Sequence, residues 1–234
     1  MKLRKLALLP AAMTFAWVGA ASAATLLNLT GPYNNTIGPQ SESAPCIIAG
    51  TECKEPADFG YNNFKQTGNR TSYDVWSTTP TPAPNAQVDG PVGTFAYTVG
   101  QITGVVGTSF SVAIDVNTAD GGETLNLFEV WNRTTDTLLY SYTGPTNIAQ
   151  GINNGNGWGD WTLGTISLLG LPTDTRIQFH AVWSGASDGA ESFFIVSTPA
   201  IPEPETYAMM LAGLGLLGFV ARRRRQGFSN PVPA

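Results

Sequence analysis

The sequence is poor in charge, in histidine and in cysteine. Only 12% of its 234 residues are charged, and it has one histidine and two cysteines. No histidine spacing typical of a metal enzyme is present, and no Gly-x-Ser-x-Gly nucleophile elbow occurs. These absences argue against an enzyme. The paired carboxylates of a glycoside hydrolase need no sequence motif, so a secreted polysaccharide hydrolase stays an alternative.

Long amphipathic helical patterns are also lacking between the two ends of the chain. The 26 glycines and 16 prolines favour short strands joined by turns. Alternating apolar and polar residues predict strands at 94–99, 109–116, 124–131, 137–142, 161–168, 177–183 and 192–197. We expect an all-β fold, an antiparallel β-sandwich of the jelly-roll type, flanked by an N-terminal signal helix and a short C-terminal transmembrane helix.

The stretch 24–90 has a weaker pattern than the rest. Thr25 to Leu29 is a candidate strand, and the proline-rich 78–85 predicts a stiff exposed loop or linker. This segment either divides an N-terminal lobe from a C-terminal one or forms a long loop in one domain. We therefore assign 24–200 to one exported β-sandwich domain with an irregular N-terminal part at 24–90.

Positive charge is concentrated at the two ends. The whole chain has a net charge of −5, but 24–200 holds five basic and 15 acidic residues, a net charge of −10. Such a domain repels phosphate backbones, so we expect no nucleic-acid partner. Its charge instead suits cations, calcium among them.

The first 23 residues have the three regions of a signal peptide. Three basic residues precede an apolar run at 6–18, and Ala21-Ser22-Ala23 follows as a cleavage pattern. We expect export by the Sec machinery and a mature chain that starts at Ala24. The alternative is an uncleaved anchor helix, for which the apolar run is short.

The C-terminal residues 201–226 combine an extended strip, an apolar helix and a basic end. Pro202, Glu203 and Pro204 form the strip, because proline does not fit a helix. A transmembrane helix is predicted at 207–221, and the stop signal after it is Arg222, Arg223, Arg224 and Arg225. The positive-inside rule keeps the arginines and the tail 227–234 in the cytoplasm and places the preceding domain outside.

These C-terminal residues closely resemble the PEP-CTERM sorting signal of Gram-negative bacteria. The resemblance implies that a membrane-embedded exosortase recognises Pro202-Glu203-Pro204 and cuts near it. It also implies an inner-membrane precursor that passes to the cell surface or the exopolysaccharide matrix. A weaker resemblance to the bodies of such proteins runs from about Asp120 to Val196 and implies no activity. The alternative for the tail is an ordinary single-span anchor.

Cys46 and Cys53 are the only cysteines. In an exported chain they are expected to form a disulfide that closes a small loop. The alternatives, a reactive thiol pair or two metal ligands, have no histidine or further cysteine nearby to support them.

Two acidic turns are candidate calcium ligands. Asp120-Gly-Gly-Glu123 and Asp188-Gly-Ala-Glu191 each precede a predicted strand, and Asp160 is a further carboxylate. Calcium takes six to eight oxygen ligands, which such turns supply. The alternative is a pair of ordinary acidic β-turns, since Asp-Gly is a common turn sequence. No other cofactor is expected.

Tryptophans supply the candidate carbohydrate contacts. Trp158 follows a glycine- and asparagine-rich run and Trp161 lies close to it, so both are candidates for stacking on sugar rings. Trp131 and Trp183 occupy strand positions that are more often core. The lone His180 also lies in a predicted strand, where a histidine is usually structural.

The leading hypothesis is a non-catalytic surface or extracellular-matrix protein associated with exopolysaccharide or a biofilm matrix. The runner-up is a carbohydrate-binding module, with calcium as its candidate cofactor. Both share one route: export, brief retention in the inner membrane, and exosortase processing.

Overall fold

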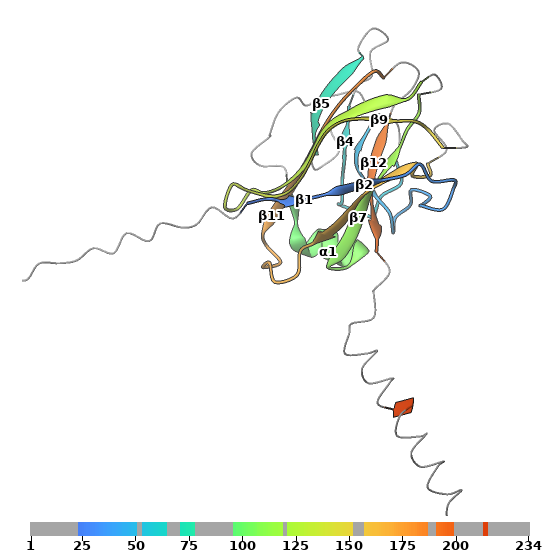
Figure 1. The fold of residues 1–234 in the computed structure, drawn as a ribbon. Coiled ribbons are helices and arrows are strands. Elements are labelled where there is room, and N and C mark those ends of the chain that lie inside the picture. Colours follow the sequence, from blue (N-terminus) through green and yellow to red (C-terminus); the bar gives the residue numbers. More distant parts are fainter. Residues whose placement is uncertain are drawn as a thin grey trace, which may run out of the picture.

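A computed structural model describes residues 23–50, 53–64, 71–77, 96–118, 121–151, 157–186, 191–198 and 213–214. Nearly all of its regular structure is β, and two sheets face each other as a sandwich (Figure 1). The all-β, sandwich-like expectation is therefore confirmed.

The first sheet has the strand order β1-β9-β8-β11-β5, and β6 pairs with the other end of β11. Its strands are β1 (Thr25–Leu26), β5 (Ser72–Trp76), β6 (Tyr97–Thr98), β8 (Glu123–Asn132), β9 (Thr137–Ile148) and β11 (Arg176–Ser184). The central strand β11 pairs antiparallel with β8 on one side and β5 on the other.

The second sheet has the strand order β2-β10-β7-β12-β3-β4. Its strands are β2 (Asn28–Thr30), β3 (Cys46–Ala49), β4 (Asn62–Asn63), β7 (Ser109–Asp115), β10 (Trp161–Ser167) and β12 (Ser192–Ser197). Strands from both sides of the proline-rich 78–85 thus share each sheet. That segment itself lies outside the described residues.

The sheets are mixed, so the expectation of a purely antiparallel sandwich is wrong in two places. β1 pairs parallel with β9, and β3 pairs parallel with β4. The predicted strand Thr25 to Leu29 divides at Leu27, whose buried side chain enters the core while β1 joins one sheet and β2 the other. Figure 1 shows these two short strands in blue, one after the other. The strands β1, β2 and β4 have only two or three residues each, too few to show an alternating pattern, so the sequence signal within 24–90 is weak.

A short helix, α1 (Val99–Val106), stands where the sequence predicted the end of a strand. Of the expected strand 94–99, the structure describes 96–99, and Tyr97 and Thr98 form the short strand β6 there. Thr98 caps the helix, because its hydroxyl accepts from the Gln101 N–H while the Gln101 side chain accepts from the Thr98 N–H. This reciprocal capping box satisfies two backbone donors and starts the helix.

Aromatic side chains fill the space between the sheets. Phe179 lies in β11 with Tyr97, Phe110 and Phe128 around it, at ring-centroid distances of 5.9, 6.3 and 6.3 Å. Trp183, predicted as core, is 1% exposed. Alternation along β11 places Phe179 and Trp183 inward.

Candidate functional site

The predicted sorting residues fall outside the described part of the chain. Pro202, Glu203, Pro204 and the four arginines belong there, as does the span 207–221 except for helical residues 213 and 214. In the described ranges, no helix is long and apolar enough to cross a membrane.

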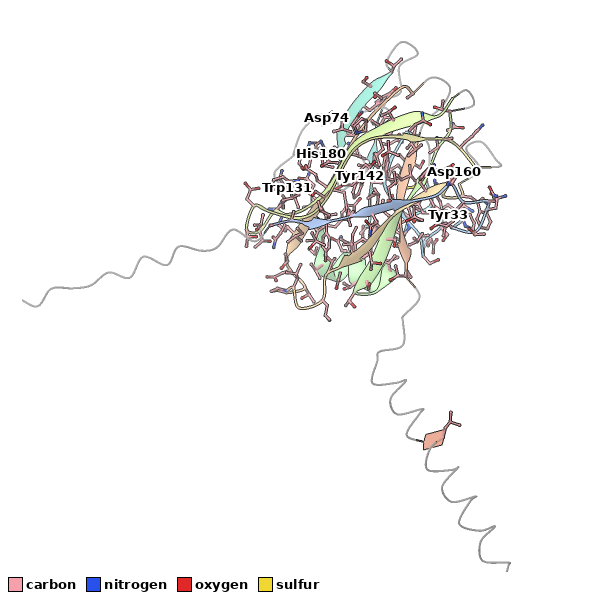
Figure 2. All side chains as sticks on the ribbon, in the orientation of Figure 1. Tyr33, Asp74, Trp131, Tyr142, Asp160 and His180 are labelled. Carbon is pink, nitrogen blue, oxygen red and sulfur yellow. A yellow bond between two sulfur atoms is a disulfide. The ribbon has the colours of Figure 1, made fainter. Side chains whose placement is uncertain are left out.

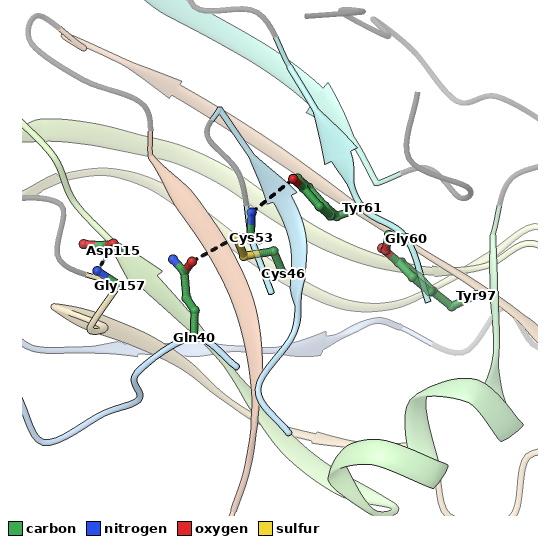
Figure 3. The surroundings of a disulfide bond; sticks show 8 residues. All are labelled: Gln40, Cys46, Cys53, Gly60, Tyr61, Tyr97, Asp115 and Gly157. Atoms are coloured by element: carbon green, nitrogen blue, oxygen red, sulfur yellow. Dashed lines mark hydrogen bonds between the residues drawn. A yellow bond between two sulfur atoms is a disulfide. The ribbon is translucent and has the colours of Figure 1, made fainter. Parts of the chain in front are cut away.

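The disulfide between Cys46 and Cys53 is confirmed (Figure 3). Cys46 is fully buried in β3, so the bridge ties the loop that leads to β4 onto the second sheet. The Cys53 N–H donates to the Tyr61 hydroxyl at 3.1 Å, and Gln40 Oε1 lies 2.9 Å from Cys53 Sγ. The described residues contain no free cysteine, which leaves the pair a structural role.

Of the five candidate calcium ligands, Glu123 and Glu191 come together, whereas Asp160 lies apart from them. Asp120 and Asp188 are outside the described residues. Glu123 is the first residue of β8 in one sheet, and Glu191 directly precedes β12 in the other. We name Glu123 and Glu191 the inner pair. It joins the two sheets at one end of the sandwich.

The inner pair is deeply buried. Each glutamate is 1% exposed, and the two carboxyls lie close enough for each to affect the pKa of the other. Thr118 donates its hydroxyl to Glu123 Oε1, and Trp183 donates its indole N–H to Glu191 Oε2 at 3.2 Å. Burial raises the pKa of Glu123, and burial together with the neighbouring Glu123 raises the pKa of Glu191 well above its usual range.

A second acidic pair, Asp115 and Asp160, lies at the same end of the second sheet. Asp160 accepts from the N–H groups of Val116 at 2.8 Å and Gly151 at 2.6 Å. Asp115 accepts from the Gly157 N–H at 2.9 Å, and its other oxygen is buried without a partner (Figure 3). Burial, with smaller contributions from Asp160 and Glu191, raises the pKa of Asp115 to about 7.

Sequence reasoning missed Asp115. It ends the alternating stretch 109–116, where a polar residue fits an exposed outward position, yet it is only 5% exposed. Among the described residues, no three histidine, cysteine or acidic side chains surround a common point that would suit a metal. The three candidate ligands that the structure describes, Glu123, Asp160 and Glu191, therefore do not form one centre.

The two candidate sugar-stacking tryptophans are both half-buried. Trp161 packs against the core and donates its indole N–H to the Ala149 carbonyl at 2.7 Å. Gly31 lies against its ring, because a Cβ at that glycine would stand 2.6 Å from a ring carbon. Trp158 lies in the segment that leads into β10. Part of the Trp161 ring is therefore used in packing and is not available to stack on a sugar.

An aromatic and charged cluster lies on the outer face of the first sheet, and Figure 2 labels three of its residues, Asp74, Trp131 and His180. We name Asp74, Trp76, Glu129, Trp131, Arg133 and His180 the outer cluster. The His180 ring stacks on Trp76 with centroids 3.9 Å apart, and the Arg133 guanidinium lies over Trp76 at 4.9 Å and Trp131 at 5.2 Å. Trp131 is half-buried here and is not part of the core, contrary to the reading of its strand position.

His180 bridges two carboxylates. Its Nε2 lies 2.7 Å from Asp74 Oδ1, and its Nδ1 lies 2.9 Å from Glu129 Oε2, which also accepts from the Trp131 indole. A carboxylate only accepts, so both contacts are hydrogen bonds only when both ring nitrogens carry a proton. With both nitrogens engaged, His180 joins β5, β11 and β8, which agrees with the structural role expected from the sequence.

The first prediction concerns Asp115. Burial favours the protonated form of Asp115 in the folded state, so the protonated carboxyl contributes its full stability to the fold below about pH 4. This contribution is lost as the pH rises to about 7. Asp115→Asn keeps an acceptor for the Gly157 N–H but removes the titration. Only the wild type loses stability between these pH values. The variant's free energy of unfolding should therefore rise relative to that of the wild type, by up to about 4 kcal/mol.

Urea unfolding at about pH 4 and about pH 8 measures this difference. Asp174→Asn removes an exposed carboxylate elsewhere and controls for net charge. If Asp115→Asn and the wild type differ equally at both pH values, Asp115 is not held as described.

Comparison with known proteins bears on the C-terminal segment. Residues 200–225 match the PEP-CTERM protein-sorting motif. No curated protein and no solved structure matches the chain. The match confirms the resemblance seen in the sequence, and such a motif implies export, processing by an exosortase and a place at the cell surface. The chain is thus an exported protein that carries a PEP-CTERM sorting motif.

Proposed function

We propose that this protein is a non-catalytic component of the cell surface or extracellular matrix, associated with exopolysaccharide. The observation that carries the proposal is the position of the sorting motif. The last strand, β12, ends at Ser197, and the motif begins at residue 200. A cut near Pro204 therefore leaves both sheets whole, so the product released from the inner membrane is the entire sandwich.

The strand order supports a jelly-roll classification of this domain. The eight main strands are arranged as β3-β12-β7-β10 in one sheet and β5-β11-β8-β9 in the other. Consecutive strands alternate between the sheets except at β8 and β9, as in two Greek keys wound together. Jelly rolls include lectin domains and cupins as well as capsid proteins, so the fold alone assigns no activity.

A non-catalytic role fits the state of the titratable groups. The inner pair is closed to solvent, which denies a polysaccharide access to its carboxyls. Both His180 nitrogens face carboxylates, which leaves neither ready to take a proton from a substrate. The alternative of a polysaccharide hydrolase would require turnover that disappears when one accessible carboxylate is replaced.

The sorting step is tested with Glu203→Ala. The substitution removes the charged side chain between Pro202 and Pro204 and leaves the signal peptide, the sandwich and the arginines unchanged. We expect export to continue while the protein accumulates in the inner membrane with its tail attached. Membrane fractionation with antibodies to the sandwich and to the tail measures the outcome.

Glu205→Ala is the matched control, since it removes one carboxylate next to the motif. Release of Glu203→Ala at the wild-type level would contradict processing at Pro202-Glu203-Pro204.

The second candidate function is carbohydrate binding, and the outer cluster favours it. The half-buried Trp131, with Glu129 and Arg133 beside it, resembles the apolar platform with a polar rim that suits a sugar ring. The cluster occupies a sheet face, where a polysaccharide chain has room to lie. Trp158 and Trp161, the candidates from the sequence, lie elsewhere at the start of β10.

Glycan-array binding by the wild type, Trp131→Ala and Trp158→Ala separates these surfaces. If the outer cluster binds sugar, Trp131→Ala should weaken binding by about tenfold or more, the equivalent of ~1.4 kcal/mol, while Trp158→Ala stays close to the wild type. The reverse order would place the site at Trp158. Saturable binding to no glycan at all would exclude this candidate function.

A further inference from the structure

The inner pair has two buried carboxyl oxygens that accept no hydrogen bond from a described residue. Glu123 Oε2 and Glu191 Oε1 receive no hydrogen bond from any N–H or hydroxyl group in the described structure. In a native interior nearly every buried polar atom has a partner, so each such oxygen calls for an explanation. Here both belong to carboxyls that reach each other across the gap between the sheets.

In the described part of the chain, none of the ion pairs found places a positive side chain on the inner pair. Arg133 pairs with Asp136, and His180 lies between Asp74 and Glu129, all away from the inner pair. The carboxyl of Glu191 also raises the pKa of Asp115, which is itself acidic. Two adjacent buried carboxylates without a counter-ion are strongly unfavourable, so the pair must bind either a proton or a cation.

We propose that Glu123 and Glu191 bind a calcium-type divalent cation that bridges the two sheets. The donor set around the pair is made of oxygen, with the Thr118 hydroxyl on Glu123 and no histidine or cysteine close by. Oxygen ligands of this kind suit calcium better than zinc or copper. Two glutamates supply up to four of its six to eight ligands, and backbone carbonyls and water complete the set.

The placement of the pair gives the cation a structural role. Glu123 starts β8 and Glu191 directly precedes β12, so one ion would hold the ends of two strands from different sheets. Binding to the folded state alone raises stability in proportion to the logarithm of the ion concentration. The extracellular location that the sorting motif implies also suits a calcium site, because extracellular modules bind calcium with Kd values of about 0.1–1 mM. The inference does not depend on the proposed matrix role.

Thermal unfolding and terbium luminescence of the full-length protein test the proposal. We expect the midpoint Tm to rise with calcium concentration relative to the chelated protein. Trp183 donates to Glu191 at 3.2 Å, so terbium bound at the pair should show tryptophan-sensitised emission that calcium displaces. Glu191→Gln should weaken both effects at least about tenfold, since one charged ligand is lost, the equivalent of ~1.4 kcal/mol.

Glu191→Gln removes a buried charge, so the chelated variant should melt at or above the Tm of the chelated wild type. Its loss of binding would then not reflect unfolding. Glu42→Gln is the matched control on an exposed glutamate and should keep the calcium response. A wild-type Tm that ignores calcium would show that the pair shares only a proton, and unchanged binding by Glu191→Gln would place the ion elsewhere. Either result overturns the proposal.

Discussion

The aromatic layer between the two sheets is the constraint on which the other features depend. Phe179 and Trp183 in the central strand β11 contact rings from both sheets, which fixes the distance and orientation of one sheet over the other. Alternation along β11 then sends His180 to the outer face and leaves Trp183 within reach of Glu191. The outer cluster and the inner pair are therefore consequences of one strand's register.

The two acidic pairs differ from the outer cluster because their carboxyl groups are buried without an opposite charge beside them. In the outer cluster, Asp74 and Glu129 meet a histidine and the Arg133 guanidinium lies over two indoles, so charge and aromatic faces are matched. At the end of the sandwich, Glu123, Glu191 and Asp115 are buried beside one another, and each leaves one oxygen without a donor. The first arrangement rigidifies a sheet face, whereas the second stays sensitive to protons and cations.

The strands that have a long alternation of apolar and polar residues were predicted correctly from the sequence. Strands β7, β8, β10, β11 and β12 lie within a residue or two of their predicted bounds. The sequence did not predict β3, because its four consecutive apolar residues show no alternation. It did not predict α1, because the Thr98–Gln101 capping box was not recognised. Asp115 and the outer cluster could not be found, since they depend on which distant strands pair. Glu123 and Glu191 could be named as candidates from the sequence, because each ends an acidic turn before a strand.

We propose that the chain is exported, folds into the sandwich outside the inner membrane, is cut at both ends and is released. Intact mass spectrometry of the protein recovered from the cell surface or the medium tests it most directly. The account predicts a species that starts at Ala24, ends near Pro204 and contains the Cys46–Cys53 disulfide. A species that still carries Arg222 to Arg225 would contradict it, because the protein would then be a stable inner-membrane protein.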